Sequence, residues 1–259
     1  MEQLNNKNIK VIVLYPSALC NLCCKYCYID KNPVLKQIDD ALEDSFNSDY
    51  YFEFSKKIFD KNIVDEMQFW GGEPFLGFHR LYNLLPKFIE YYPKLSHFLT
   101  STNFTVDNFE DEFFGFLNIL GKYPERTFQF SLQLSIDGPE YINDNNRGIG
   151  VTKSFLEHYN SLVNKIDDIL PKNVILDVHF KQTLTEKEIA ELTNQELFIN
   201  YFKFFDELVT LFKKKVKNPN VSIGCNLPNT AVPGETTVAD GQRFAKYTKL
   251  AYELTKMNY

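Results

Sequence analysis

The sequence contains no apolar run of the roughly 18–20 residues that a membrane-spanning helix needs. Its first ten residues, MEQLNNKNIK, lack the pattern of a secretory signal peptide. It also lacks a long basic segment, and its net charge is −6. We therefore expect a cytoplasmic protein that has no membrane partner and whose main partner is not a nucleic acid.

Cysteine is scarce and unevenly distributed. The chain has five cysteines, and four of them lie within the eight residues from Cys20 to Cys27. Such a tight group is typical of metal binding and not of a disulfide framework. The fifth, Cys225, stands alone, and we expect it to be a small buried residue and not a metal ligand.

The bulk composition is that of a folded protein. Hydrophobic residues make up 44% of the 259 residues, and charged residues make up 24%. This is enough apolar material for one large core, so we predict a single domain over residues 1–259. The 24 phenylalanines and 15 tyrosines are expected to pack that core.

Strand-like and helix-like segments alternate along the chain. Apolar, β-branched runs predict strands at residues 9–15, 64–70, 96–103, 128–136, 174–182 and 221–225. Helices are expected at about 50–61, 78–91, 107–120, 152–168, 185–217 with a break near Asn194, and 239–256. Asp107 is expected to cap the third of these helices, and Thr185 with Glu188 has capping-box spacing.

Two segments fall outside this alternation. Residues 28–50 are predicted to form a polar, irregular insertion or mobile lid, and residues 226–259 a C-terminal loop and helix. The alternation itself indicates parallel strands with right-handed crossovers. Six such units predict an α/β fold, namely a partial (β/α)6 TIM-like barrel that is open on one side.

The most distinctive motifs all follow predicted strands. The cysteines follow the first strand, Gly71-Gly72-Glu73-Pro74 the second, Thr102-Asn103 closes the third, and Ser135-Ile136-Asp137-Gly138-Pro139 closes the fourth. In α/β barrels the active site is built at the carboxyl ends of the strands. We therefore expect these motifs to meet at one mouth of the barrel.

The cysteine motif points to a particular metal centre. Cys20, Cys24 and Cys27 have the spacing Cys-x3-Cys-x2-Cys. Three thiolates cannot ligate all four irons of a cubic cluster, so one iron is left free to bind and reduce a small molecule. Two alternatives remain: a zinc site that uses Cys23 as well, and a Cys-x2-Cys redox pair. In the cluster interpretation Cys23 is surplus and points away.

These motifs together resemble a known family. The three cysteines, with Tyr26 directly before the last, resemble the signature of the radical S-adenosylmethionine (SAM) enzymes, and residues 71–74 resemble their second motif. Residues 135–139 with Arg147 resemble the branch that contains anaerobic sulfatase maturases and other peptide-modifying enzymes. The resemblance covers residues 9 to about 225. With Cys225 alone outside the motif, we expect no auxiliary cluster.

The resemblance implies an oxidoreductase with two cofactors, a [4Fe-4S] cluster and SAM. In that family the reduced cluster cleaves SAM to methionine and a 5′-deoxyadenosyl radical, which removes a hydrogen atom from the substrate. The electron donor is expected to be a flavodoxin or a ferredoxin. The substrate is expected to be a peptide or protein side chain. Alternatives are the same chemistry on a small molecule or nucleotide, or a non-catalytic iron–sulfur or zinc protein that senses or binds.

Within this resemblance, several residues acquire cofactor roles. Gly71 and Gly72 allow a ligand to approach the backbone closely, or simply form a tight turn. Glu73 is suited to the ammonium group of the methionine part of SAM. Arg147 is suited to its carboxylate, or belongs to a surface salt bridge.

The remaining candidates have weaker signals. Ser135 is expected to bind ribose or carboxylate oxygens, Asn103 to face the cofactor or form a turn, and Tyr26 to lie beside the adenine or pack its loop. The catalytic residue is unknown. Asp137 is a candidate base or the organiser of its turn. His179 and Lys181 lie on one face of the fifth predicted strand, and either is a candidate to reach the substrate.

Overall fold

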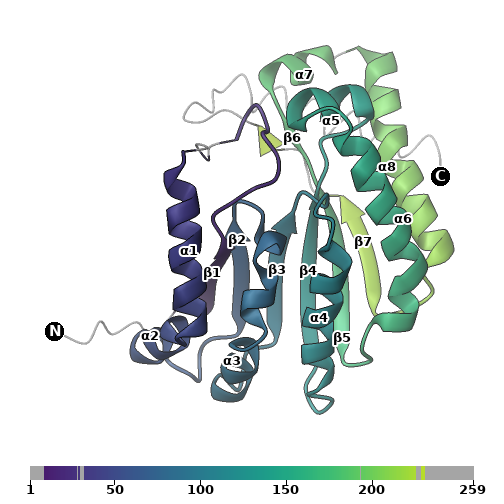
Figure 1. Ribbon diagram of the computed structural model, residues 1–259. Coiled ribbons are helices and arrows are strands. Elements are labelled where there is room, and N and C mark those ends of the chain that lie inside the picture. Colours follow the sequence, from purple (N-terminus) through teal and green to yellow (C-terminus); the bar gives the residue numbers. More distant parts are fainter. Residues whose placement is uncertain (1–8, 28, 30–31, 193, 226–228, 231–259) are drawn as a thin grey trace.

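The computed structural model describes residues 9–27, 29, 32–192, 194–225 and 229–230 (Figure 1). Its main sheet has six parallel strands in the order β1-β2-β3-β4-β5-β7. The strands are β1 Val11–Ser17, β2 Glu66–Gly71, β3 His97–Thr102, β4 Phe128–Ser135, β5 Val174–Lys181 and β7 Val221–Cys225. A second, two-stranded sheet pairs β6 Thr183–Leu184 with β8 Asn229–Thr230.

Each connection between neighbouring strands of the main sheet carries helical structure. The α-helices are α1 Val34–Asn47, α2 Tyr50–Ile58, α3 Leu85–Tyr91, α4 Phe109–Gly121, α5 Glu140–Arg147, α6 Val151–Ile169, α7 Glu186–Glu191 and α8 Gln195–Lys215. Two short 3-10 helices, η1 Pro74–Leu76 and η2 Phe78–Leu81, follow β2. None of the described helices combines the length and apolar character needed to cross a membrane.

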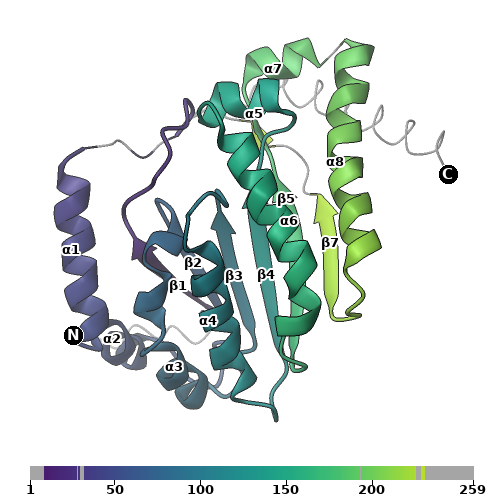
Figure 2. The same ribbon diagram turned by 45° about the vertical axis from the view of Figure 1, so that its right-hand side comes forward.

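The strand order decides where the helices lie. Neighbouring strands follow chain order, and right-handed crossovers then place every connecting helix on the same face of the sheet. Figures 1 and 2 show the helices along one side of a curved sheet. Among the described strands β1 and β7 end the sheet and do not pair with each other. The predicted α/β fold, a partial barrel of parallel strands open on one side, is confirmed.

Aromatic side chains fill the layer between sheet and helices. Phe69 of β2 and Phe98 of β3 stack with 6.3 Å between ring centroids, and the ring of Phe116 on α4 lies 5.6 Å from each. All three side chains are buried. The expected role of the aromatic residues in the core is confirmed.

Residues 34–47 form helix α1, so the prediction of an irregular segment was wrong there. Val34, Ile38, Leu42 and Phe46 recur at a spacing of four residues, which forms an apolar stripe on a helix. Phe46 is buried, and Leu42 packs against the core. The stripe was obscured in the sequence by the polar residues between its members.

Three other expectations need correction. The predicted helix 78–91 is interrupted: η2 ends at Leu81, and α3 begins at Leu85 with Pro86 in its first turn. A proline is accepted in the first turn of a helix and not in its interior. Helix α4 begins after Asn108, so Asp107 is not its N-cap. Helix α5 was not predicted.

Other local predictions are confirmed or lie outside the described residues. Thr185 and Glu188 form the expected capping box at α7. The break near Asn194 is real, because its side chain accepts hydrogen bonds from the first backbone N–H groups of α8. The C-terminal loop and helix predicted over 226–259 lie outside the described residues, except for β8 at residues 229–230. A single domain over the whole chain stays a prediction.

Candidate functional site

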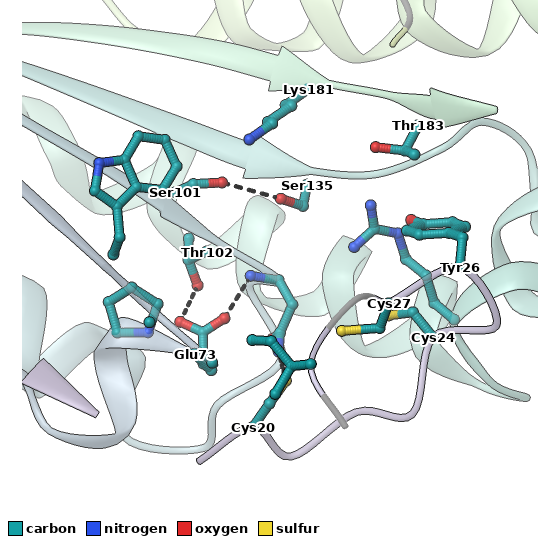
Figure 3. A pocket seen from close by; sticks show the side chains of 17 residues that line it. Cys20, Cys24, Tyr26, Cys27, Glu73, Ser101, Thr102, Ser135, Lys181 and Thr183 are labelled. Atoms are coloured by element: carbon teal, nitrogen blue, oxygen red, sulfur yellow. Dashed lines mark hydrogen bonds between the residues drawn. The ribbon is translucent and has the colours of Figure 1, made fainter. Parts of the chain in front are cut away.

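A pocket of about 480 Å³ opens at the carboxyl ends of the strands (Figure 3). It is lined by the loop after β1 and by the ends of β2, β3, β4 and β5. The structure brings together here every residue predicted to bind metal or cofactor: Cys20, Cys24, Cys27, Tyr26, Gly71, Gly72, Glu73, Asn103, Ser135 and Arg147. The volume is typical of sites for cofactor-sized ligands.

Three of the four clustered cysteines line this pocket. Cys20 and Cys24 are half-buried and Cys27 is exposed, whereas Cys23 is exposed and lies outside the lining. The Cys20 sulfur accepts hydrogen bonds from the backbone N–H of Leu22 at 3.4 Å and from Nδ2 of Asn103 at 3.7 Å. The three predicted ligands therefore line the pocket, and the surplus cysteine, Cys23, does not.

This donor set fits a cubic iron–sulfur cluster. In the described part of the chain, no three His, Cys, Asp or Glu side chains converge closely enough to hold a single metal ion. The ligands of a cubic cluster bind separate irons, so they do not need to converge on one point. Three thiols on one loop, facing one pocket, match that requirement.

The start of the cysteine loop is fixed by helix α1. Asp39 accepts hydrogen bonds at 2.8 Å from the Ser17 hydroxyl and from the Ala18 backbone N–H. Arg80 binds the same carboxylate at 2.8 Å and the carbonyl of Pro16 at 2.7 Å. Burial acts to raise the pKa of Asp39, but the hydrogen bonds from Arg80 and Ser17 outweigh it and lower the pKa. The sequence did not reveal this support.

Gly71 and Gly72 hold the second motif against the cysteine loop. A Cβ on Gly72 would lie 2.2 Å from the Leu19 carbonyl oxygen, and one on Gly71 would lie 2.1 Å from that of Ser17. Gly71 also has φ +137°, which side chains rarely adopt. The next backbone N–H, of Glu73, donates to the Leu19 carbonyl at 2.7 Å. The glycines therefore have a packing role in addition to the predicted access for a ligand.

Glu73 is 1% exposed and accepts three hydrogen bonds. Its Oε1 accepts from the Phe75 N–H at 3.1 Å and the Thr102 hydroxyl at 2.8 Å, and its Oε2 accepts from the Asn103 N–H at 2.6 Å. The bond to Thr102 is visible in Figure 3. Burial raises the pKa of Glu73 to about 7, although these hydrogen bonds act in the opposite direction.

This raised pKa predicts a pH-dependent stability. The folded state holds the Glu73 proton more tightly than the unfolded state, whose pKa is near 4.5. The stabilisation is complete below that value and is lost as the pH rises through about 7. Relative to Glu73→Gln, the free energy of unfolding should fall by up to about 3 kcal/mol from about pH 4 to about pH 8. Denaturant titrations across this range test it, and parallel pH curves for the two proteins would contradict it.

Arg147 forms a buried ion pair with Asp137. Nε and Nη2 of Arg147 donate to the two oxygens of Asp137 at 3.0 and 2.8 Å. Arg147 is 6% exposed and Asp137 is 0% exposed. The pair is therefore buried, and the alternative that Arg147 belongs to a surface salt bridge was wrong. The ion pair offsets the burial of Arg147 and raises its pKa.

Asp137 connects the cysteine loop to the end of β4. It accepts a hydrogen bond from the Tyr26 hydroxyl at 2.6 Å and from the Thr183 backbone N–H at 2.9 Å. Burial raises the pKa of Tyr26, and the nearby Asp137 carboxylate adds to this effect. Asp137 thus makes long-range contacts beyond its own turn, and it lies behind the pocket lining. Its candidacy as a base stays a prediction.

Helix α5 supports the other side of the cysteine loop. The backbone N–H of Lys25 donates to the carbonyl of Asn146 at 2.8 Å, and Lys25 Nζ donates to the side chain of Asn145 at 2.6 Å. Asn146 also donates to Glu188 at 3.0 Å. These residues carry no signal in the sequence, because their partners are far away along the chain.

The far wall of the pocket is formed by β3, β4 and β5. The hydroxyls of Ser101 and Ser135 lie 3.2 Å apart, and Lys181 pairs with Ser135 across the β4–β5 register. His179 and Lys181 share a face of β5, as strand alternation predicts. Lys181 reaches the pocket lining, whereas His179 lies one step deeper and outside it. Thr102 lines the pocket as part of the motif expected there, whereas Trp70, Ser101 and Thr183 also line it and were not predicted.

The comparison with known proteins agrees with the donor set. No curated protein matches the chain. A family model described as a 4Fe-4S single cluster domain matches residues 9–145, which is more than half of the 259 residues and includes the cysteine loop, the double-glycine motif and Asp137. The three pocket cysteines and this match together show that the chain belongs to the family of 4Fe-4S single cluster domains.

Proposed function

We propose that this protein is a radical SAM enzyme that acts on a peptide or protein side chain. The observation that carries the proposal is the convergence of three cysteines, Glu73, Arg147 and the double glycine on one pocket. The matched cluster domain, of a kind found in radical SAM enzymes, supports it. The open side of the partial barrel supports a substrate as extended as a peptide. A flavodoxin or ferredoxin is the proposed electron donor.

Cys20, Cys24 and Cys27 would hold the cluster, which leaves one iron without a protein ligand. When bound and reduced, the cluster supplies the electron that cleaves SAM into methionine and a 5′-deoxyadenosyl radical, which then removes a hydrogen atom from the substrate. The chain's own residues bind and orient the two ligands.

Glu73 has capacity for one more hydrogen-bond donor. A carboxylate offers about four lone-pair positions, and three are occupied by Phe75, Thr102 and Asn103. The remaining position, on Oε2, suits the ammonium group of SAM. A cation at that position favours the ionised carboxylate and opposes the effect of burial on the pKa of Glu73.

Arg147 likewise has donors to spare. A guanidinium carries five N–H groups, and Asp137 engages two of them. The others are available to the carboxylate of SAM, because Arg147 lines the pocket. Asp137 keeps the guanidinium plane fixed, so this recognition does not require reorganisation.

The proposal predicts a definite product. Anaerobically reconstituted protein, incubated with SAM and dithionite, should release 5′-deoxyadenosine and methionine in equal amounts. Chromatography with mass detection measures both products, and a Cys24→Ala variant is the control. If iron-loaded, reduced protein forms no 5′-deoxyadenosine, the proposed function is wrong.

A further inference from the structure

One cationic side chain of the pocket has no role in the proposed cofactor binding. Lys181 ends β5, and its Nζ lies 5.1 Å from the centroid of the Trp70 ring at the end of β2. Both side chains line the pocket. Figure 3 shows Lys181 across the pocket from Cys20, with the Ser101–Ser135 pair between them. Lys181, with the Trp70 ring beside it, therefore lies across the pocket from Cys20.

Lys181 lacks a counter-ion in the part of the chain that the structure describes, where no carboxylate forms an ion pair with it. Burial lowers the pKa of Lys181, and the positive charge of Arg147 lowers it further. The face of an indole ring attracts an ammonium group but compensates only part of the hydration that burial removes. The ammonium group of Lys181 would therefore gain free energy from an anion bound next to it.

The other charges of the pocket already have partners. Arg147 is neutralised by Asp137, and Glu73 accepts three hydrogen bonds. The spare donors of Arg147 are assigned above to the SAM carboxylate, so a second anion would gain most at Lys181. Two nearby hydroxyl groups can donate hydrogen bonds to such an anion. Ser135 is the register partner of Lys181, and Thr183 lines the same wall.

We propose that Lys181 binds an anionic group of the substrate, either a carboxylate or a phosphate, while the Trp70 ring contacts the adjoining part of the substrate. The inference rests on the proposed function in calling this ligand the substrate. The anion site itself is independent of that function. The proposed anion site places a negatively charged group of the substrate across the pocket from Cys20.

The protein contains its own reporter for this site, because Trp70 is its single tryptophan. Full-length, iron-loaded protein with SAM is titrated with inorganic phosphate and, separately, with acetate, at constant ionic strength set with chloride. The tryptophan emission of the wild type should change saturably with at least one of them. The anion that binds more tightly identifies the group, and either result supports the site.

Three variants make the titration specific. Lys181→Met should weaken the anion response at least tenfold, and Lys181→Arg should restore part of it. Lys61→Met is the matched control, because Lys61 is an exposed lysine outside the pocket that contacts the Tyr91 ring; its response should equal that of the wild type.

Two results would overturn the inference. One is an anion response that is absent in the wild type or unchanged in Lys181→Met. The other is a loss of SAM affinity in Lys181→Met that exceeds the loss of anion affinity, which would assign Lys181 to the cofactor. If the wild type forms no 5′-deoxyadenosine but keeps a Lys181-dependent anion response, the proposed enzyme function fails and the anion site stands.

Discussion

Replacement of Cys20, Cys24 or Cys27 by alanine is expected to abolish the iron–sulfur cluster. Each of these thiols lines the pocket, and a cubic cluster with only two protein ligands is not retained. The iron content of anaerobically reconstituted protein should fall from about four irons per chain to near zero. Formation of 5′-deoxyadenosine should be lost to the same extent.

Cys23→Ala and Cys225→Ala are the matched controls for this experiment. Cys23 lies in the same loop but outside the pocket lining. Cys225 lies at the end of β7 and is exposed, so the prediction that it is buried was wrong. Both variants should keep the iron content of the wild type. If Cys23→Ala lost its metal as completely as the other three variants, the result would favour the alternative of a zinc site with four thiolates.

Arg147→Met is expected to destabilise the folded protein by about 3–5 kcal/mol, because it leaves the Asp137 carboxylate buried without its cationic partner. Asp137→Asn should also be costly, since Arg147 is then the uncompensated charge. Denaturant titrations of the two single variants and the double variant measure the coupling between the side chains.

The double variant should be less destabilised than the sum of the single variants, because neither charge is then left alone. Its structure should still place Tyr26 against the end of β4, with a weaker hydrogen bond. Strictly additive losses would show that Asp137 and Arg147 act independently, contrary to the ion pair described above.

The sequence was most informative about the strands and the motifs that follow them. Each predicted strand overlaps an observed strand of the main sheet. Short β-branched runs between helices rarely form any other secondary structure. The motifs after β1, β2, β3 and β4 converge because the carboxyl ends of parallel strands share one edge. Every predicted ligand residue therefore reached the pocket.

The sequence could not reveal which polar side chains pair across the fold. Asp137 and Arg147 were assigned separate roles, yet they bind each other: Asp137 precedes helix α5, and Arg147 is the last residue of that helix. Asp39 lay in a segment expected to be irregular, and its partner Arg80 is 41 residues away. Such pairs depend on the placement of helices, which hydrophobic periodicity does not specify.

The sequence also could not predict which of His179 and Lys181 lines the pocket. Alternation placed both on one face, but only the register with β4 shows that Lys181 lies level with Ser135 at the pocket, while His179 lies level with Gln133. A shift of two residues along the strand keeps the face and changes the depth. Distance from the mouth of the barrel is therefore a tertiary property.

The central claim is that three cysteines leave one corner of the cluster open to SAM. The most direct test is the electron paramagnetic resonance spectrum of the reduced, iron-loaded protein, recorded before and after SAM is added. We expect the signal of a reduced [4Fe-4S] cluster, with a clear change in its g-values when SAM is present. A spectrum that stays the same at saturating SAM would contradict the claim.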